Sequence, residues 1–199
     1  MGVQKQLLMI VHPGVAEWEV VVPIWCLTPE IDLHLASTST KDVIGKIGLT
    51  IHAHYLVREV NIKEFGGIYL PGGVDPETRQ GFNTSLGRNE ELLNLLRAFA
   101  EEGKLVAAIC GAPLVLGAAG LLDGRHFASD ITTDAEGWFE KGLRAERLIA
   151  LDGNILTASV RAIFPFCATI LRWFGEEAAA KEFEEFLELK APPLTVRLF

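Results

Sequence analysis

The sequence predicts an α/β fold with a mostly parallel sheet and helices on both of its faces. Short apolar runs of strand length recur along the chain, and segments of ten or more residues with helical spacing separate most of them. This alternation is typical of parallel sheets, because a parallel pair of strands needs a crossover that a helix usually supplies. The 199 residues contain neither an internal repeat nor a long linker, so we expect one domain over residues 1–199.

The first part of the chain is predicted to form two strands, a helix and a hairpin. Residues 7–11 are continuously apolar, and residues 32–36 alternate between apolar and polar. Residues 17–27 have helical spacing, with Pro23 inside the segment, so a kink or a break is expected there. Glycines between β-branched residues at 43–58 predict a hairpin or short edge strands.

Two further buried strands are predicted at 67–70 and 105–109. Between them, Asn89 is placed to cap a helix that ends at Gly103. A helix rich in small residues is expected at 113–119.

The last third is predicted to contain a strand, a helix start, a hairpin and two closing helices. Thr-Asp-Ala-Glu resembles a capping box, and Asp-Gly marks the turn of the hairpin. The strand is expected at 125–129, and the helix is expected to start at 133. The hairpin pairs 148–151 with 155–159, and the two closing helices are expected at 163–174 and 176–189.

Charge and cysteine usage restrict the class of protein. The net charge of −8 argues against a nucleic-acid partner and against docking on anionic membranes, which attract basic proteins. Cys26, Cys110 and Cys167 are far apart and lack zinc-site spacing, so we expect free thiols in a reducing cytoplasm, without a metal or another cofactor. Glycines and a proline interrupt the charge-free stretch 105–122, which favours a strand and a helix over a membrane span.

The clearest chemical signal surrounds Cys110. This cysteine falls between a predicted buried strand and a helix, with Ala108 before it and Gly111 and Ala112 after it. A nucleophile elbow needs small neighbours because its turn is tight. From spacing alone, Cys110 is either such a nucleophile or a buried apolar residue, the usual place of a free cysteine.

Two other positions follow predicted strands. Gly72 and Gly73 come directly after the strand at 67–70, and their backbone N–H groups could stabilise a developing negative charge or form a simple tight turn. His12 follows the first strand, at the sheet edge where open α/β sheets bind ligands, so it is a possible site residue.

Taken together, these motifs resemble the ThiJ/PfpI superfamily, which is related to class I glutamine amidotransferases. The resemblance runs from about residue 7 to 187 and implies a flavodoxin-like sandwich with a nucleophile elbow, usually a homodimer. The matching segments are Gly14-Val-Ala-Glu-Trp-Glu-Val-Val-Val-Pro23, Ile68-Tyr-Leu-Pro-Gly-Gly73, Ala107-Ala-Ile-Cys-Gly-Ala-Pro113 and Asp152-Gly-Asn-Ile-Leu-Thr157.

The resemblance also implies roles for individual residues. Cys110 falls at the reactive cysteine and Glu19 at its acidic partner, while the oxyanion amides fall on Gly72 or Gly73 and on Gly111. A thiolate and a carboxylate side by side would repel each other, so we expect the pair to share a proton. We therefore predict a lowered pKa for Cys110, at a helix N-terminus, and a raised pKa for Glu19.

Several positions depart from the family pattern. Members proposed as proteases or glyoxalases have His where Gly111 stands, which disfavours protease activity here. Asp130 stands where other members place a His; it could accept a proton, bind substrate, or be a loop or N-cap residue. His126 is expected on the same side as Asp130, Arg161 is expected to add a positive charge at the pocket, and Glu17 is expected to be exposed.

These residues predict a small cysteine-dependent hydrolase, hydratase or glyoxalase-like lyase. Cys110 would attack an electrophilic carbon of a small molecule while Glu19 carries a proton. The segment Leu114-Val-Leu-Gly-Ala-Ala-Gly-Leu-Leu122 and the late acidic helix followed by Ala-Pro-Pro also resemble the isonitrile-hydratase branch, which has Asp where Glu19 stands and Thr where Gly111 stands. The alternatives are a redox-responsive stress or chaperone-type protein that oxidises the same thiol, and a small-molecule-binding module without catalysis.

Overall fold

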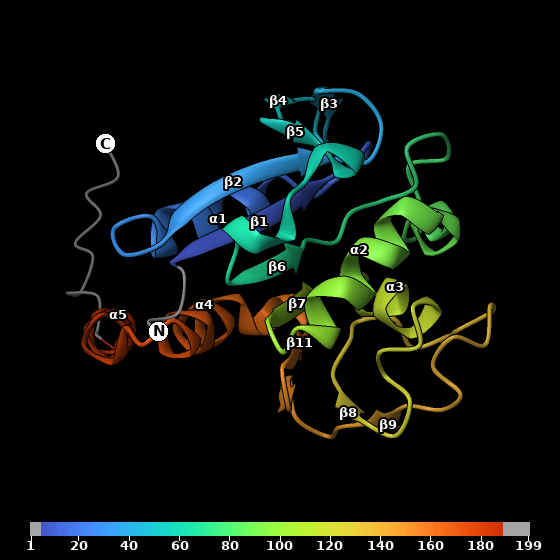
Figure 1. Ribbon diagram of the computed structural model, residues 1–199. Helices are drawn as coiled ribbons and strands as arrows, with labels where there is room; N and C mark the ends of the chain where they lie inside the picture. The colour runs from blue at the N-terminus through green and yellow to red at the C-terminus, as the bar shows by residue number, and fades with distance from the viewer. Residues whose placement is uncertain (1–4, 189–199) are drawn as a thin grey trace, which may run out of the picture.

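A computed structural model describes residues 5–188 of the chain, and a seven-stranded sheet forms its centre (Figure 1). All neighbouring strands are parallel except the pair at one edge, a hairpin. This arrangement confirms the predicted α/β class. In sheet order the strands are β10 (Ile149–Asp152), β11 (Ile155–Ala158), β7 (Leu105–Ile109), β6 (Gly67–Leu70), β1 (Gln6–Val11), β2 (Asp32–Ser37) and β5 (Tyr55–Leu56).

Helices cover both faces of the sheet because the side chains of its strands alternate. In β1, Leu7, Met9 and Val11 pack into one core, and Leu8 and Ile10 into the other. The first core lies against α1, α4 and α5, and the second against α2 and α3 (Figure 1). The bounds are α1 (Trp18–Leu27), α2 (Glu90–Glu101), α3 (Pro113–Ala118), α4 (Ile163–Trp173) and α5 (Glu177–Glu188).

The loops contain short strands and 3-10 helices outside the central sheet. The expected hairpin near residue 45 is present as the antiparallel pair β3 (Asp42–Ile44) and β4 (Thr50–His52). The strand expected at 125–129 is only β8 (His126–Phe127), which pairs with β9 (Leu143–Arg144) in a separate small sheet. The 3-10 helices are η1 (Val57–Glu59), η2 (Ile62–Glu64), η3 (Thr84–Arg88) and η4 (Val160–Ala162).

The helix start expected from residue 133 is wrong. Asp134 instead accepts hydrogen bonds from the N–H groups of Glu136 and Phe139, which closes a turn rather than a helix. Gly137 follows in the left-handed region, with φ of 73°, and this conformation is incompatible with a continuing α-helix.

Helix α1 continues through Pro23, where a kink or a break is expected from the sequence. A proline inside a helix leaves the carbonyl four residues earlier without its usual donor. Here that carbonyl belongs to Glu19, and the buried Tyr69 hydroxyl donates a hydrogen bond to it at 2.8 Å. Tyr69 thus replaces the missing backbone bond and fixes the segment that carries Glu19 to strand β6.

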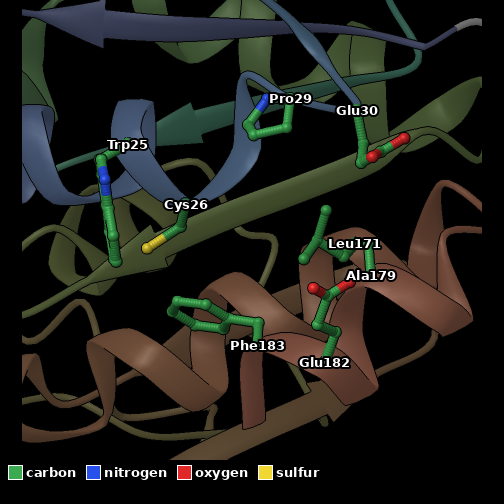
Figure 2. A pocket seen from close by; sticks show the side chains of 8 residues that line it. All are labelled: Trp25, Cys26, Pro29, Glu30, Leu171, Ala179, Glu182 and Phe183. Carbon is green, nitrogen blue, oxygen red and sulfur yellow. The ribbon is translucent and has the colours of Figure 1, made fainter. Parts of the chain in front are cut away.

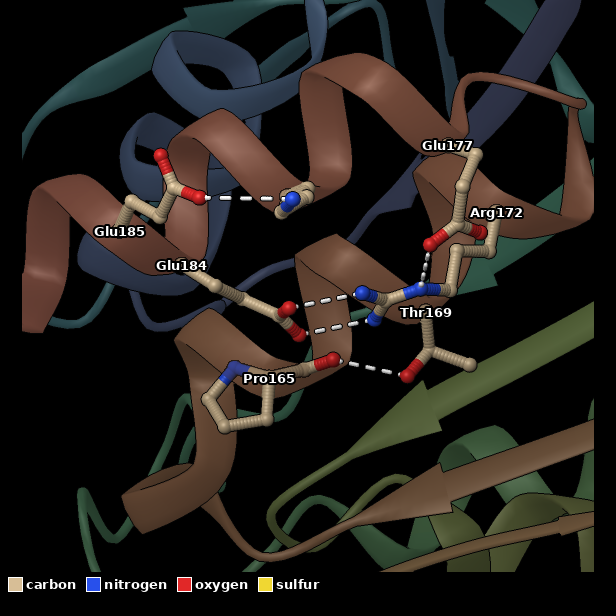
Figure 3. Close-up of polar contacts among 7 residues, drawn as sticks. Pro165, Thr169, Arg172, Glu177, Glu184 and Glu185 are labelled. Carbon is tan, nitrogen blue, oxygen red and sulfur yellow. Dashed lines mark hydrogen bonds and ion pairs between the residues drawn. The ribbon is translucent and has the colours of Figure 1, made fainter.

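Arg172 joins the two last helices through ion pairs with two glutamates (Figure 3). Arg172 at the end of α4 donates to both carboxylate oxygens of Glu184 in α5, at 2.8 Å and 2.7 Å, and to Glu177 at 3.1 Å. A bidentate pair of this kind fixes the relative orientation of two elements. Within residues 5–188, none of the helices is long and apolar enough for a membrane span; the charge-free stretch 105–122 includes β7 and α3.

Five long parallel strands lie side by side in the order β2, β1, β6, β7 and β11. When these five strands are numbered from one to five along the chain, their order in the sheet is 2-1-3-4-5. The order reverses between β1 and β6, and ligands of open α/β sheets bind beyond the carboxyl ends of the strands at such a point. The turns after β1, β6 and β7 meet there.

Candidate active site

Cys110 occupies the turn between β7 and α3 in a strained backbone conformation. Its φ is 61°, a region that non-glycine residues rarely adopt. The Cys110 N–H donates to the carbonyl of Ala158 in the neighbouring strand, and the Cys110 carbonyl accepts from the Asp130 N–H, both at 2.9 Å. The surrounding chain therefore holds this turn from two sides, as a nucleophile elbow requires.

Small neighbours make the turn possible. A Cβ added to Gly72 would lie 2.9 Å from the Cβ of Cys110, and one added to Gly111 would lie 2.6 Å from the Phe82 ring. Gly111 therefore has no room for a larger side chain unless Phe82 moves.

The carboxyl group of Glu19 converges with the Cys110 thiol on Gly72. A Cβ added to Gly72 would lie 3.0 Å from Glu19 Oε2 and 3.2 Å from Cys110 Sγ. The Gly72 N–H donates to Glu19 Oε2 at 2.7 Å. Glu19 is almost fully buried, with 2 % of its surface exposed. The structure thus brings together the predicted cysteine and its predicted acidic partner.

Burial controls the proton of this pair. It raises the pKa of Glu19 to about 7, against the opposing effect of the hydrogen bonds to Gly72 and Cys110. Burial, with the negative charges of Glu19 and Asp130, also raises the pKa of the Cys110 thiol well above its usual range. The raised pKa expected for Glu19 is confirmed, and the lowered pKa expected for Cys110 is wrong.

The reason is that the thiol is largely shielded from water. The N–H of Gly111 favours the thiolate, but it does not offset burial and two nearby carboxylates. At rest the thiol therefore keeps its proton, and Glu19 is the adjacent group that can take it.

The glycine amides divide into two roles. The Gly72 N–H is committed to the Glu19 carboxylate. Within the described part of the chain, the Gly73 N–H donates to no backbone oxygen, and Gly73 lines the same cavity as Cys110. Of the two glycines after β6, Gly73 therefore has the N–H that a developing oxyanion could use.

A cavity of about 300 Å³ opens over the thiol. Its size suits a small molecule. Its walls come from the start of α1, the β3–β4 turn and the elbow. The lining residues are Ala16, Glu17, Trp18, Glu19, Lys46, Ile47, Gly73, Cys110 and Val160.

The structure places Asp130 beside the elbow as an anchor of the neighbouring turn. Its carboxylate accepts hydrogen bonds from the Ser159 hydroxyl at 2.6 Å and from the Val160 N–H at 2.7 Å. Both oxygens are thus engaged with the segment that begins η4. Asp130 acts on Cys110 through its charge and its backbone N–H.

His12 lies under the site and joins two of its loops. The side chain is fully buried, with Nδ1 3.1 Å from the Pro13 carbonyl and Nε2 3.3 Å from the Pro71 carbonyl. Burial lowers the pKa of His12, which keeps the ring neutral. His12 thus supports the turn that carries Gly72, and it does not line the cavity.

Two other predicted positions do not join this group. His126 is exposed and pairs with Asp152, at the opposite end of β11 from Cys110. Arg161 is also exposed; it follows Val160 but does not line the cavity, so the positive charge expected there comes from another residue.

That residue is Lys46, which the sequence reasoning missed. It sits between Gly45 and Gly48 in the β3–β4 turn, a lone charge in an otherwise apolar segment, and this was the available signal. The expectation that Glu17 is exposed is also wrong. Glu17 is 3 % exposed and accepts hydrogen bonds from the N–H groups of Ile47 and Leu49 in the same turn.

A second cavity, of about 350 Å³, lies between the end of α1 and helices α4 and α5 (Figure 2). Its thiol, Cys26, accepts a hydrogen bond from the buried Cys167 thiol, which lowers the pKa of Cys26. The two carboxylates at this cavity, Glu30 and Glu182, belong to exposed residues. The Cys110 cavity is the stronger candidate because a thiol and a buried carboxyl converge there.

The fold defines a flavodoxin-like α/β protein, and Cys110 occupies a strained turn between a strand and a helix of it. The model of the DJ-1/PfpI family matches residues 5–173, so the chain belongs to this family. An uncharacterized protein of Archaeoglobus fulgidus is 27 % identical over 169 residues, covering 84 % of this chain and 96 % of that protein. A deglycase of Thermococcus kodakarensis is 30 % identical over 152 residues, covering 75 % of this chain and 86 % of the deglycase.

Solved structures show the same fold. Drosophila melanogaster DJ-1beta matches with a TM-score of 0.80 at 22 % identity, covering 96 % of this chain and all of that chain (100 %). A DJ-1 superfamily protein from Salmonella typhimurium matches with a TM-score of 0.77 at 23 % identity, covering 94 % and 100 %. The narrower resemblance to the isonitrile-hydratase branch stays a prediction.

Proposed function

We propose that this protein is a small cysteine-dependent enzyme that acts on the electrophilic carbonyl carbon of a small molecule, as a hydrolase or a glyoxalase-like lyase. The convergence of Cys110 Sγ and the Glu19 carboxyl on Gly72, inside a cavity of about 300 Å³, carries this proposal. Relatives that are named deglycases support it.

In the proposed reaction, ionised Glu19 removes the thiol proton as Cys110 Sγ attacks the carbonyl carbon. The carbon–sulfur bond forms, and the π electron pair moves to the oxygen, which the Gly73 N–H stabilises. In a hydrolase, Glu19 returns the proton to the leaving group, which departs as the carbonyl re-forms; water then attacks the resulting thioester, Glu19 takes the water proton, and the carbon–sulfur bond breaks as that proton returns to Cys110 Sγ. In a glyoxalase-like lyase, the proton goes to the oxygen to give a hemithioacetal, the hydrogens on its carbon and oxygen move to the neighbouring carbonyl group to leave a thioester, and water cleaves this thioester in the same way. A base with a pKa of about 7 suits this work near neutral pH.

A substrate panel tests the proposal. Glyoxal, methylglyoxal, their adducts with amines and an isonitrile are incubated with the protein, and products are followed by NMR. We expect turnover of at least one carbonyl compound, loss of turnover in Cys110→Ser, and unchanged turnover in the matched control Cys26→Ser. Full activity of Cys110→Ser would overturn the proposal, and turnover of the isonitrile alone would favour the hydratase branch.

The redox-responsive alternative ranks second, because thiolates rather than thiols react with peroxide and the pKa of Cys110 is raised. Mass spectrometry after mild peroxide treatment distinguishes the two. Preferential conversion of Cys110 to a sulfinic acid, without turnover of any carbonyl compound, would favour redox sensing. Tight metabolite binding with neither reaction would favour a binding module.

We also propose a homodimer in a reducing cytoplasm, as the family resemblance and the widely spaced cysteines imply. Trp18, Val21 and Trp25 occur at helical spacing on α1 and are 46 %, 56 % and 58 % exposed. This apolar stripe fits a contact with a second copy of the chain. Light scattering should give twice the 21.8 kDa chain mass for the wild type and a shift toward monomer for Val21→Glu; a monomeric wild type would refute the dimer.

A further inference from the structure

The Lys46 side chain brings a positive charge without a partner to the Cys110 cavity. Within residues 5–188, the Lys46 ammonium makes neither a hydrogen bond nor an ion pair, although Lys46 lines the cavity. The whole chain has a net charge of −8. A cation left unpaired at the cavity of so acidic a protein is available to a ligand.

The turn that carries Lys46 is held in place by a buried carboxylate. Glu17 accepts from the Ile47 N–H at 2.9 Å and 3.1 Å, one distance for each carboxylate oxygen, and from the Leu49 N–H at 3.3 Å. The Lys46 N–H donates to the Val15 carbonyl at 2.8 Å. A Cβ added to Gly45 would lie 2.3 Å from Glu17 Oε1, so a side chain at this position would displace the Glu17 carboxylate. The backbone of Lys46 is therefore fixed at the cavity.

The nearby negative charges are already engaged by neutral donors. Glu19 accepts from the Gly72 N–H, and Asp130 accepts from the Ser159 hydroxyl and the Val160 N–H. The charge of Lys46 reaches the site, since it lowers the pKa of Glu19. Lys46 can thus attract a ligand without first breaking an ion pair.

We propose that Lys46 binds an oxyanion group of the substrate, a carboxylate or a phosphate, while Cys110 attacks the carbonyl carbon of the same molecule. This inference rests on the proposed function, and it narrows the substrate to a small anionic carbonyl compound. The Trp18 and Ile47 side chains beside Lys46 supply the apolar wall for its short carbon chain.

Alkylation of Cys110 by a matched pair of reagents tests this inference. Iodoacetate carries a carboxylate and iodoacetamide is neutral; with each, the carbon–sulfur bond forms, iodide leaves, and the thiol proton passes to Glu19 or to water. The rate at Cys110 is measured by peptide mass spectrometry, and the iodoacetate-to-iodoacetamide ratio is divided by that of glutathione.

We expect the normalised ratio to fall by about three- to tenfold in Lys46→Gln, the size of a partly screened charge contact. It should be retained in Lys46→Arg and in the control Lys181→Gln, which makes the same charge change on α5. High salt should reduce the wild-type ratio. Thermal melts verify that each variant is folded.

The outcomes separate the inference from the proposed function. Equal ratios in the wild type and Lys46→Gln, with Cys110 labelled in both, would overturn the role of Lys46 and leave the nucleophile intact. A ratio lowered by Arg161→Gln and not by Lys46→Gln would also overturn it. Failure of both reagents to label Cys110 in the folded protein would overturn the proposed function. Acetate and inorganic phosphate are then compared as competitors that protect Cys110 from alkylation in the wild type and not in Lys46→Gln. Stronger protection by acetate would indicate that Lys46 binds a carboxylate, and stronger protection by phosphate would indicate a phosphate group.

Discussion

Replacement of Glu19 by Gln should change how the stability of the protein depends on pH. Burial raises the pKa of this carboxyl from 4.5 to about 7, so the folded state binds more protons than the unfolded chain between these values. The contribution of Glu19 to wild-type stability must therefore decrease as pH rises through this window. Glutamine keeps an oxygen that can accept from the Gly72 N–H, but it has no proton to lose.

The structure sets the size of this effect. The difference between 4.5 and about 7 corresponds to about 3 kcal/mol, and about 2.5 kcal/mol of it falls between about pH 5 and pH 8.5. Relative to the wild type, Glu19→Gln should thus gain about 2.5 kcal/mol over this range, since the other titrating groups are common to both proteins.

Urea unfolding at both pH values, followed by circular dichroism, provides the measurement. The control Glu91→Gln removes a carboxylate from an exposed position on α2 and should follow the wild-type pH dependence. If the stability of Glu19→Gln runs parallel to that of the wild type from pH 5 to 8.5, the Glu19 carboxyl is not held neutral by burial and the reasoning is refuted.

Three other substitutions test the supports of the site. Tyr69→Phe removes the donor to the carbonyl left free by proline in α1 and should lower the free energy of unfolding by about 1–3 kcal/mol; an unchanged urea midpoint would contradict this. Glu17→Gln weakens the bonds to the 45–49 turn, so amide exchange there should speed up about tenfold, corresponding to about 1.4 kcal/mol, while exchange in the sheet stays constant. Gly111→Ala forces a methyl group against Phe82 and should cost about 1–3 kcal/mol in thermal or urea unfolding; an equally stable variant would show that the ring moves freely.

The central strands were predictable because their signals are local. Residues 7–11, 67–70 and 105–109 are apolar runs bounded by turn residues, which is typical of strands buried on both faces. The helix start predicted from Thr-Asp-Ala-Glu at 133 is wrong because a capping pattern does not by itself specify a helix. A capping pattern needs an apolar helix behind it, and Gly137 with the side-chain bonds of Asp134 closes a turn instead.

The site was predictable in part. Small residues around Cys110 form a local pattern, and the resemblance to a family located Glu19. Glu17 and Lys46 meet at the β3–β4 turn, where Ile47 lies thirty residues after Glu17. Nothing in their local sequence shows that this turn returns over the start of α1. The pKa of Cys110 was misjudged because a helix terminus can be read from sequence, whereas burial beside two carboxylates cannot.

The pH dependence of the alkylation of Cys110 by iodoacetamide, in the wild type and Glu19→Gln, tests the central claim most directly. If Glu19 takes the thiol proton, the wild-type rate should rise with a midpoint near 7, and at about pH 8 Glu19→Gln should react at least about tenfold more slowly without that midpoint. Identical rate profiles for the two proteins would contradict the assignment of Glu19 as the base for Cys110.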